Sequence, residues 1–168
     1  KRLAHGEAGL PGLLDDYAFL TLRLLELYET TFQPALLTEA MALTELLLAH
    51  FWDPQGGFFL SPDDGEALPV RGKTLDDGAY PSGNAVAASN LIRLARMTGR
   101  SEYEDRARTT LRSLGIHETP LRATFALLAL DHLLGPSQEI VVAGPPQGED
   151  TQRLLQTIAA HPGPPRVV

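Results

Sequence analysis

The chain has 168 residues, of which 43% are hydrophobic and 21% charged, as is ordinary for a globular domain with a single core. Its net charge of -7 argues against nucleic-acid binding, which needs a basic surface to neutralise phosphates. The absence of cysteine excludes disulfides, thiolate catalysis and cysteine metal sites, and a cytoplasmic location is the simplest expectation.

The sequence contains no segment typical of a membrane protein. No apolar run approaches the roughly 18 residues needed to span a bilayer. Residues 1–12 lack the apolar stretch of a signal peptide, and the chain does not begin with Met. We therefore expect a piece of a longer protein that does not interact with membranes.

Two helices are predicted first, over about Leu14–Thr30 and Pro34–Phe51. The first is apolar on nearly every side, which predicts burial on more than one face. The second has one apolar stripe and a polar side marked by Glu39 and Glu45, which is typical of an outer, amphipathic helix.

A long loop from Trp52 to Gly83 follows, rich in Gly, Pro and Asp. Residues 57–60 and 67–71 are predicted to form two short strands around a turn, giving a β-hairpin-like loop over 56–71. A loop of this length in a compact domain is usually functional or has structure of its own.

Three more helices are predicted at about Asn84–Met97, Ser101–Leu114 and Thr119–Leu134. The middle one is strongly charged, with Ser101 and Glu104 at capping-box spacing, and the other two are largely apolar. The five helices thus alternate between inner and outer character. This alternation favours a mainly α fold, a partial (α/α) toroid of helical hairpins over residues 1–136.

An internal repeat supports the hairpin as the repeating unit. Shifting the sequence by 67 positions superimposes Leu24 on Leu91 and Thr31 on Thr98, together with the linkers between paired helices. The tail, residues 137–168, differs from the repeats. Strands at 139–143 and 166–168 with a helix at 150–160 predict a small β-α-β appendix that acts as a structural cap.

Two polar motifs open the predicted inner helices. Asp15 and Asp16, followed by Tyr17, can cap a helix or contribute carboxylates to a site. Residues 76–84 bring Asp76, Asp77, Tyr80, Ser82 and Asn84 to the next inner helix, and can equally form an Asx-rich turn.

Paired carboxylates suit glycoside chemistry, in which one acts as an acid and the other as a base or nucleophile. We therefore take Asp16, Asp76 and Asp77 as catalytic candidates. Asp15, Tyr17, Trp52, Tyr80, Ser82 and Asn84 are candidate ligand-binding residues. The five histidines show no metal-ligand spacing, so we expect neither a metal nor a cofactor.

Three segments resemble a known family: residues 10–29, residues 51–60 and residues 76–96, with the DDYA and DGAYPSGN motifs. They are similar to the C-terminal part of the thioredoxin-domain-containing proteins of the bacterial YyaL and animal spermatogenesis-associated type. The resemblance implies an N-terminal thioredoxin-like domain and a toroid like those of N-acylglucosamine 2-epimerases and six-hairpin glycosidases. Only the later part of such a ring is present here.

Two functional hypotheses follow. In the first, the complete parent binds or processes a carbohydrate-like small molecule in a cleft at the inner-helix N-termini, as a glycosidase-like or epimerase-like enzyme. In the second, the chain is a non-catalytic scaffold that serves the thioredoxin-like domain. Exposed apolar inner helices would then pack against the missing N-terminal part of the parent or against another copy of the chain.

Overall fold

The computed structural model describes residues 3–4, 7–8, 11–65, 68–161 and 166–167. Its α-helices are α1 (Leu14–Thr31), α2 (Pro34–His50), α3 (Gly83–Thr98), α4 (Ser101–Ser113), α5 (Thr124–Leu134) and α6 (Glu149–Ala160). A 3-10 helix, η1, covers Pro120–Arg122. The strands are β1 (Leu3–Ala4) paired antiparallel with β2 (Glu7–Ala8), and β3 (Gln138–Glu139) paired parallel with β4 (Arg166–Val167). The protein is therefore mainly α.

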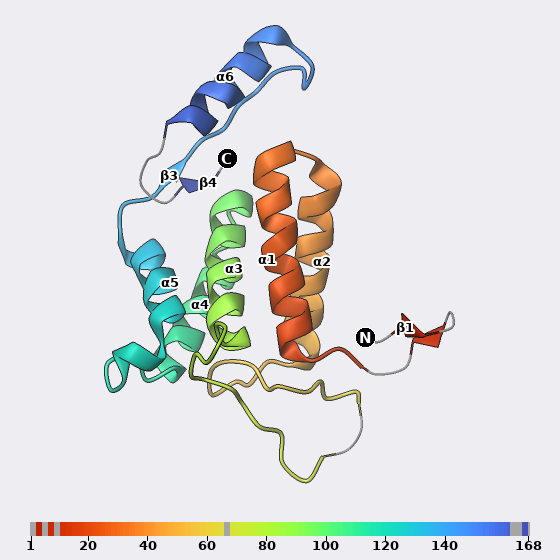
Figure 1. The fold of residues 1–168 in the computed structure, drawn as a ribbon, viewed down its shortest axis with the longest axis vertical. Helices are drawn as coiled ribbons and strands as arrows, with labels where there is room; N and C mark the ends of the chain where they lie inside the picture. Colours follow the sequence, from red (N-terminus) through yellow and green to blue (C-terminus); the bar gives the residue numbers. More distant parts are fainter. Residues whose placement is uncertain (1–2, 5–6, 9–10, 66–67, 162–165, 168) are drawn as a thin grey trace.

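Helices α1 to α5 pack as antiparallel hairpins (Figure 1). Helix α1 pairs with α2, and α3 pairs with α4, while α1, α3 and α5 lie next to one another in a row. The three helices of the row start at the same end of the molecule, the lower end in Figure 1. The predicted helices over 14–30, 34–51, 84–97 and 101–114 are confirmed to within one residue at each end. Helix α5 begins at Thr124 rather than at Thr119, with η1 before it, and these five helices alone do not define a ring.

Helix α3 occupies the centre of the row, and twelve of its sixteen residues are buried. Small side chains such as Ala85, Ala87 and Ala88 allow α1 and α5 to pack closely on either side of it. Helix α4 is polar by comparison and buries only Tyr103, Ala107, Thr110 and Leu111. The burial therefore agrees with the inner assignment of α3 and the outer assignment of α4, whereas α1 and α5, also expected to be inner, bury only four of eighteen and three of eleven residues.

The capping of α4 differs from the prediction. Arg100 is its N-cap residue and makes no side-chain cap hydrogen bond, so Ser101 lies inside the first turn. The carboxylate of Glu104 instead accepts from Arg108 at 2.7 Å. The predicted capping box is wrong because the helix begins one residue earlier than the Ser101–Glu104 spacing requires.

Glycine at position 83 brings the first turns of α1 and α3 together. A Cβ atom at this position would lie 2.9 Å from Cγ of Leu14, too close for any real side chain. Only glycine therefore allows the two helices to approach so closely at their N-terminal ends. Both polar motifs of the sequence lie at this contact.

The loop between α2 and α3 is held by hydrogen bonds rather than by strands. Trp52 and Phe58 form an isolated antiparallel bridge, and the N–H of Leu60 donates to the carbonyl of Gly72 at 2.8 Å. The expected strands at 57–60 and 67–71 are not found among the described residues of this loop, and Ala67 lies outside them. The N–H of Leu14 donates to the carbonyl of Leu60 at 2.9 Å, which ties the loop to α1.

The C-terminal segment is less regular than predicted. Strand β3 ends at Glu139 instead of continuing to residue 143, and Val141 is 90% exposed. Helix α6 buries none of its residues, so it does not cover a sheet as the helix of a β-α-β unit would. The predicted strand at 166–168 is seen as the two residues of β4, while Val168 lies outside the described part.

Candidate functional site

The two polar motifs meet at the N-terminal ends of α1 and α3, which is the lower end of the helical row in Figure 1. Gly83 is the point of closest approach, with Leu14 and Asp15 directly against it. The sequence-predicted site residues are therefore gathered at one end of the fold. Their hydrogen bonds decide which of them remain available to a ligand.

Asp15 has the most unusual environment among the predicted carboxylates. Its Oδ1 atom is buried and has no hydrogen-bond partner. Burial raises the pKa of Asp15, the neighbouring Asp16 carboxylate raises it further, and the N–H of Gly83 partly opposes both. The Gly83 N–H lies close enough to act on this carboxylate, but its geometry falls short of a hydrogen bond.

Asp16 and Tyr17 have simpler roles in the structure. Oδ2 of Asp16 accepts a hydrogen bond from the N–H of Leu13 at 2.9 Å, which caps the first turn of α1, and the side chain is otherwise exposed. The Tyr17 ring is half-buried, with its centroid 5.3 Å from that of Phe51. Tyr17 therefore packs α1 against the end of α2.

Asp77 connects two helices of the inner row. Its Oδ1 accepts from the N–H of Ser82 at 2.9 Å, just before α3. Its Oδ2 accepts from the N–H of Phe125 at 2.8 Å and from the Thr124 hydroxyl at 3.2 Å, in the first turn of α5. Both carboxylate oxygens are thus used in fastening α5 to the start of α3.

Asp76 points to a different partner. Its Oδ2 lies 2.6 Å from the guanidinium of Arg122 in η1, and 43% of its side chain is exposed. The two adjacent aspartates therefore have different partners, because Asp77 accepts from backbone N–H groups whereas Asp76 forms a surface ion pair.

Asn84 is fully buried and fully hydrogen-bonded. Its Oδ1 accepts from the N–H of Phe58 at 2.7 Å, and its Nδ2 donates to the carbonyls of Phe58 and Thr74, both at 3.0 Å. Ser82 is the N-cap of α3, and its Oγ accepts from the N–H of Ala85 at 3.2 Å. Both side chains serve the backbone around the loop.

Trp52 and Tyr80, the other two aromatic candidates besides Tyr17, differ in how their rings are packed. Trp52 packs edge to face on Phe58, with centroids 5.2 Å apart, and the Arg106 guanidinium lies 4.6 Å from the Trp52 ring. Tyr80 is 63% exposed and contacts Phe19 by its edge, with centroids 6.1 Å apart. Tyr80 is therefore the better placed of the two to stack on a ligand.

A hollow beside these helices lies at the opposite end of the row. A groove of about 820 Å³ runs between the C-terminal ends of α1 and α3 and helix α6. None of the predicted site residues lines it. Of the nine candidates, Asp15, Asp16 and Tyr80 retain capacity for a ligand, whereas Asp77, Ser82 and Asn84 are committed to the backbone.

Comparison with known proteins gives matches over most of the chain. Mouse (Mus musculus) spermatogenesis-associated protein 20 is 39% identical over 153 residues, which is 88% of this chain. The chain is homologous to part of that protein. Human spermatogenesis-associated protein 20 is 35% identical over 158 residues, and an uncharacterised Caenorhabditis elegans protein is 30% identical over 147 residues.

The homologous region is only part of each relative. It covers 19% of the mouse spermatogenesis-associated protein 20 and 20% of the human one, so the chain spans about a fifth of their length. No family model matches the chain. The names of these relatives specify no reaction, ligand or partner.

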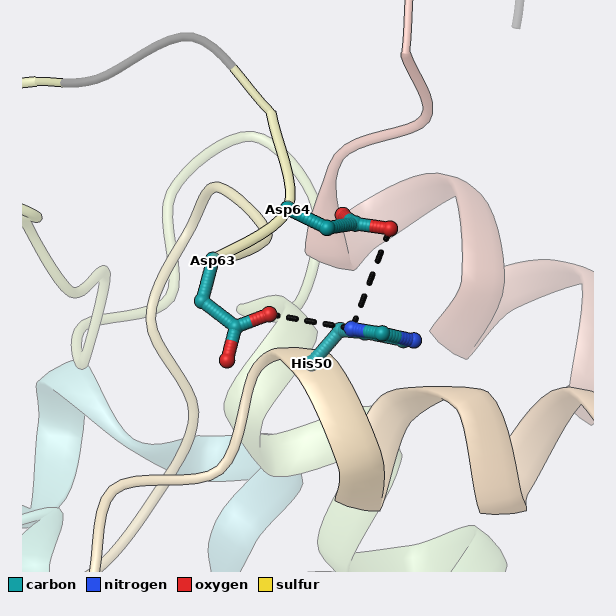
Figure 2. A group of neighbouring side chains, drawn as sticks. All are labelled: His50, Asp63 and Asp64. Carbon is teal, nitrogen blue, oxygen red and sulfur yellow. Dashed lines mark hydrogen bonds and ion pairs between the residues drawn. The ribbon is translucent and has the colours of Figure 1, made fainter.

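Two polar clusters escaped the sequence analysis. The first joins His50, at the end of α2, to Asp63 and Asp64 in the following loop (Figure 2). The second joins Arg93 of α3 to Glu26 and Glu29 of α1. In each cluster the basic residue lies 13 or more positions from the carboxylates, so no local spacing rule identifies the cluster, although the 67-residue repeat pairs Glu26 with Arg93.

The first cluster changes the expectation that the histidines form no metal-ligand group. Nδ1 of His50 lies 2.9 Å from Asp63 Oδ1, and the hydrogen bond to His50 lowers the pKa of Asp63.

Among the described residues, no helix is both long and apolar enough to cross a membrane.

Proposed function

We propose that this chain is a non-catalytic helical scaffold, an arc of an (α/α) toroid within a larger protein. The observation that carries this proposal is the bonding of Asp77 and Asn84. Their side chains are satisfied by backbone groups of the preceding loop and of α5, as loop anchors are, and Asn84 is fully buried. In this arrangement residues 1–136 provide the hairpins and residues 137–168 are an appendix.

Exposed leucines on α1 and α5, the two outermost helices of the inner row, support a role in packing against other parts of a larger protein. Leu13, the N-cap residue of α1, and Leu20 and Leu27 within α1 recur every seven residues and are 42%, 51% and 50% exposed. On α5, Leu128 and Leu134 are 66% and 67% exposed. Helical arrays bury such faces against the next hairpin, so we expect other parts of the parent, the thioredoxin-like domain among them, to cover them.

A second candidate function is the binding or processing of a carbohydrate-like ligand. The buried, unpartnered oxygen of Asp15 and the exposed ring of Tyr80 favour it. In that case Asp15 or Asp16 would supply the acid or base of a glycosidase-like or epimerase-like reaction in the complete ring. Catalysis by Asp76 or Asp77 remains a prediction, and the backbone bonds of Asp77 do not favour it.

The scaffold proposal is tested by the state of the isolated chain. We expect it to self-associate in light scattering after gel filtration and to bind a hydrophobic dye, and the double variant L20Q/L27Q to reduce both effects. The matched control is V141Q, which changes an apolar side chain that is 90% exposed but lies outside the helical row. A monomeric wild-type chain without dye binding would contradict the proposal.

The ligand candidate needs a different measurement on the parent protein. Neutral sugars would be titrated into the wild-type parent and its D16N and Y80A variants. Binding that both substitutions weaken without changing the melting temperature would favour the ligand-binding function over the scaffold. A cytoplasmic location is part of the proposal, and fractionation of cells that express the tagged parent would test it.

A further inference from the structure

We propose that His50, Asp63 and Asp64 bind a divalent first-row transition-metal ion, with Zn²⁺ as the representative case. The three side chains converge from the last residue of α2 and from the loop that follows it (Figure 2). One donor atom from each lies within 4.8 Å of the other two. The site is separate from the polar motifs considered above.

The donor spacing fits an ion of this size. His50 Nδ1 is 2.9 Å from Asp63 Oδ1 and 3.8 Å from Asp64 Oδ2. Ligands bound to Zn²⁺ at about 2.0–2.1 Å lie roughly 3–3.5 Å from one another. An ion can therefore replace the direct His50–Asp63 hydrogen bond through small side-chain rotations, without any rearrangement of the loop.

The backbone already holds the donors in place. The N–H of Asp63 donates to the carbonyl of His50 at 3.0 Å. The Arg71 guanidinium donates to the same carbonyl at 2.8 Å and also to the carbonyl of Ser61. These bonds fix the end of α2 against the Asp63–Asp64 turn, so binding an ion needs little additional ordering.

The donor types select the metal. One imidazole nitrogen with two carboxylate oxygens suits Zn²⁺ and its first-row neighbours, whereas Mg²⁺ and Ca²⁺ prefer oxygen ligands alone. Three protein donors leave at least one coordination position open to water or to another ligand, as in metal sites that act chemically rather than structurally. The charge of nearby Arg71 opposes the cation, so we expect moderate affinity.

Isothermal titration of ZnCl₂ into the metal-stripped full chain tests the proposal. We expect one Zn²⁺ per chain, and at least about tenfold weaker binding for H50A and D64N. Asp64 is 64% exposed and lies 3.8 Å from His50, so D64N should fold normally. Circular dichroism would verify that each variant is folded.

The matched control is H117A. His117 is 81% exposed and lies 3.6 Å from Glu118. Within the described part of the chain, no third donor joins this histidine–carboxylate pair. Its loss should leave Zn²⁺ affinity unchanged. The proposal is overturned if the wild-type chain does not bind Zn²⁺, if H50A and D64N bind it as well as the wild type, or if Ca²⁺ binds with equal affinity.

Discussion

Glu26 and Arg93 occupy equivalent positions in the two helical repeats, 67 residues apart, and form an ion pair of 2.7 Å. Glu29, one turn further along α1, lies 3.0 Å from the same guanidinium. The Arg93 side chain is only 9% exposed. Equivalent residues meet because α1 and α3 run side by side in the same direction, so the repeat in the sequence becomes a contact in space.

Replacing Arg93 with Ala should lower the free energy of unfolding by about 2–3 kcal/mol, because the substitution removes both ion pairs of a nearly buried guanidinium. Urea unfolding monitored by circular dichroism would measure this loss. The control is R153A, which breaks the Arg153–Glu149 pair on α6, where the arginine is 66% exposed. A loss for R93A no larger than that for R153A would show that the pair contributes little.

Replacing Asn84 with Ala should destabilise the chain by about 3 kcal/mol. The substitution leaves the buried N–H and carbonyl of Phe58 without partners, and an unsatisfied buried group costs about 1–3 kcal/mol. The free energy of unfolding in urea is the measurement. Gln55→Ala, which removes an exposed amide from the same loop, should change it by less than about 0.5 kcal/mol.

The adjacent aspartates should respond differently to truncation. Asp77→Ala should cost about 2 kcal/mol, because Phe125 and Ser82 each lose a charge-assisted hydrogen bond, whereas Asp77→Asn should cost less since one oxygen remains. Asp76→Ala should cost below about 1 kcal/mol, as expected for an exposed ion pair. Equal losses of stability at the two positions would contradict the role of Asp77 in holding α5 against the start of α3.

Asp15→Asn should raise the melting temperature at pH 7, by no more than about 2 °C because the side chain is partly exposed to screening solvent. Burial raises the pKa of Asp15 in the folded chain, so folding favours its protonated form. The wild-type chain therefore loses stability as the pH rises from about 4 through the raised pKa, and the variant does not.

Melting curves of both proteins between pH 3 and pH 8 would measure the difference. The advantage of D15N should disappear below about pH 4, where Asp15 is protonated in the folded and the unfolded chain alike. An advantage that grows on acidification would mean that the environment of Asp15 favours its charged form instead.

Gly83→Ala should destabilise the chain by about 1–3 kcal/mol, since the new methyl group would overlap Leu14 and push α1 from α3. Gly78→Ala is the matched control, because nothing lies within 4 Å of a Cβ atom at that exposed position. Thermal and urea unfolding would compare the two variants. Equal stability of the two would show that the first turns of α1 and α3 can separate at little cost.

The helices could be predicted from the sequence because their signals are local. Apolar periodicity and small residues marked the inner helices, Pro34 marked the start of α2, and the 67-residue repeat gave the hairpins. The periodicity, the small residues and Pro34 each act within one or two helical turns, so these signals survive without knowledge of the neighbouring elements. The strand predicted at 139–143 failed because strands need a partner, and Glu139 is the one residue of that segment that pairs within the described strands.

The roles of the polar residues were decided by the tertiary structure. Asp77 binds Phe125, which lies 48 positions away, Asn84 binds Phe58, and His50 meets Asp63. A carboxylate or an amide has the same composition whether it caps a helix, anchors a loop or binds a ligand. Its role depends on which donors the fold places around it, and those donors come from segments that only packing brings together.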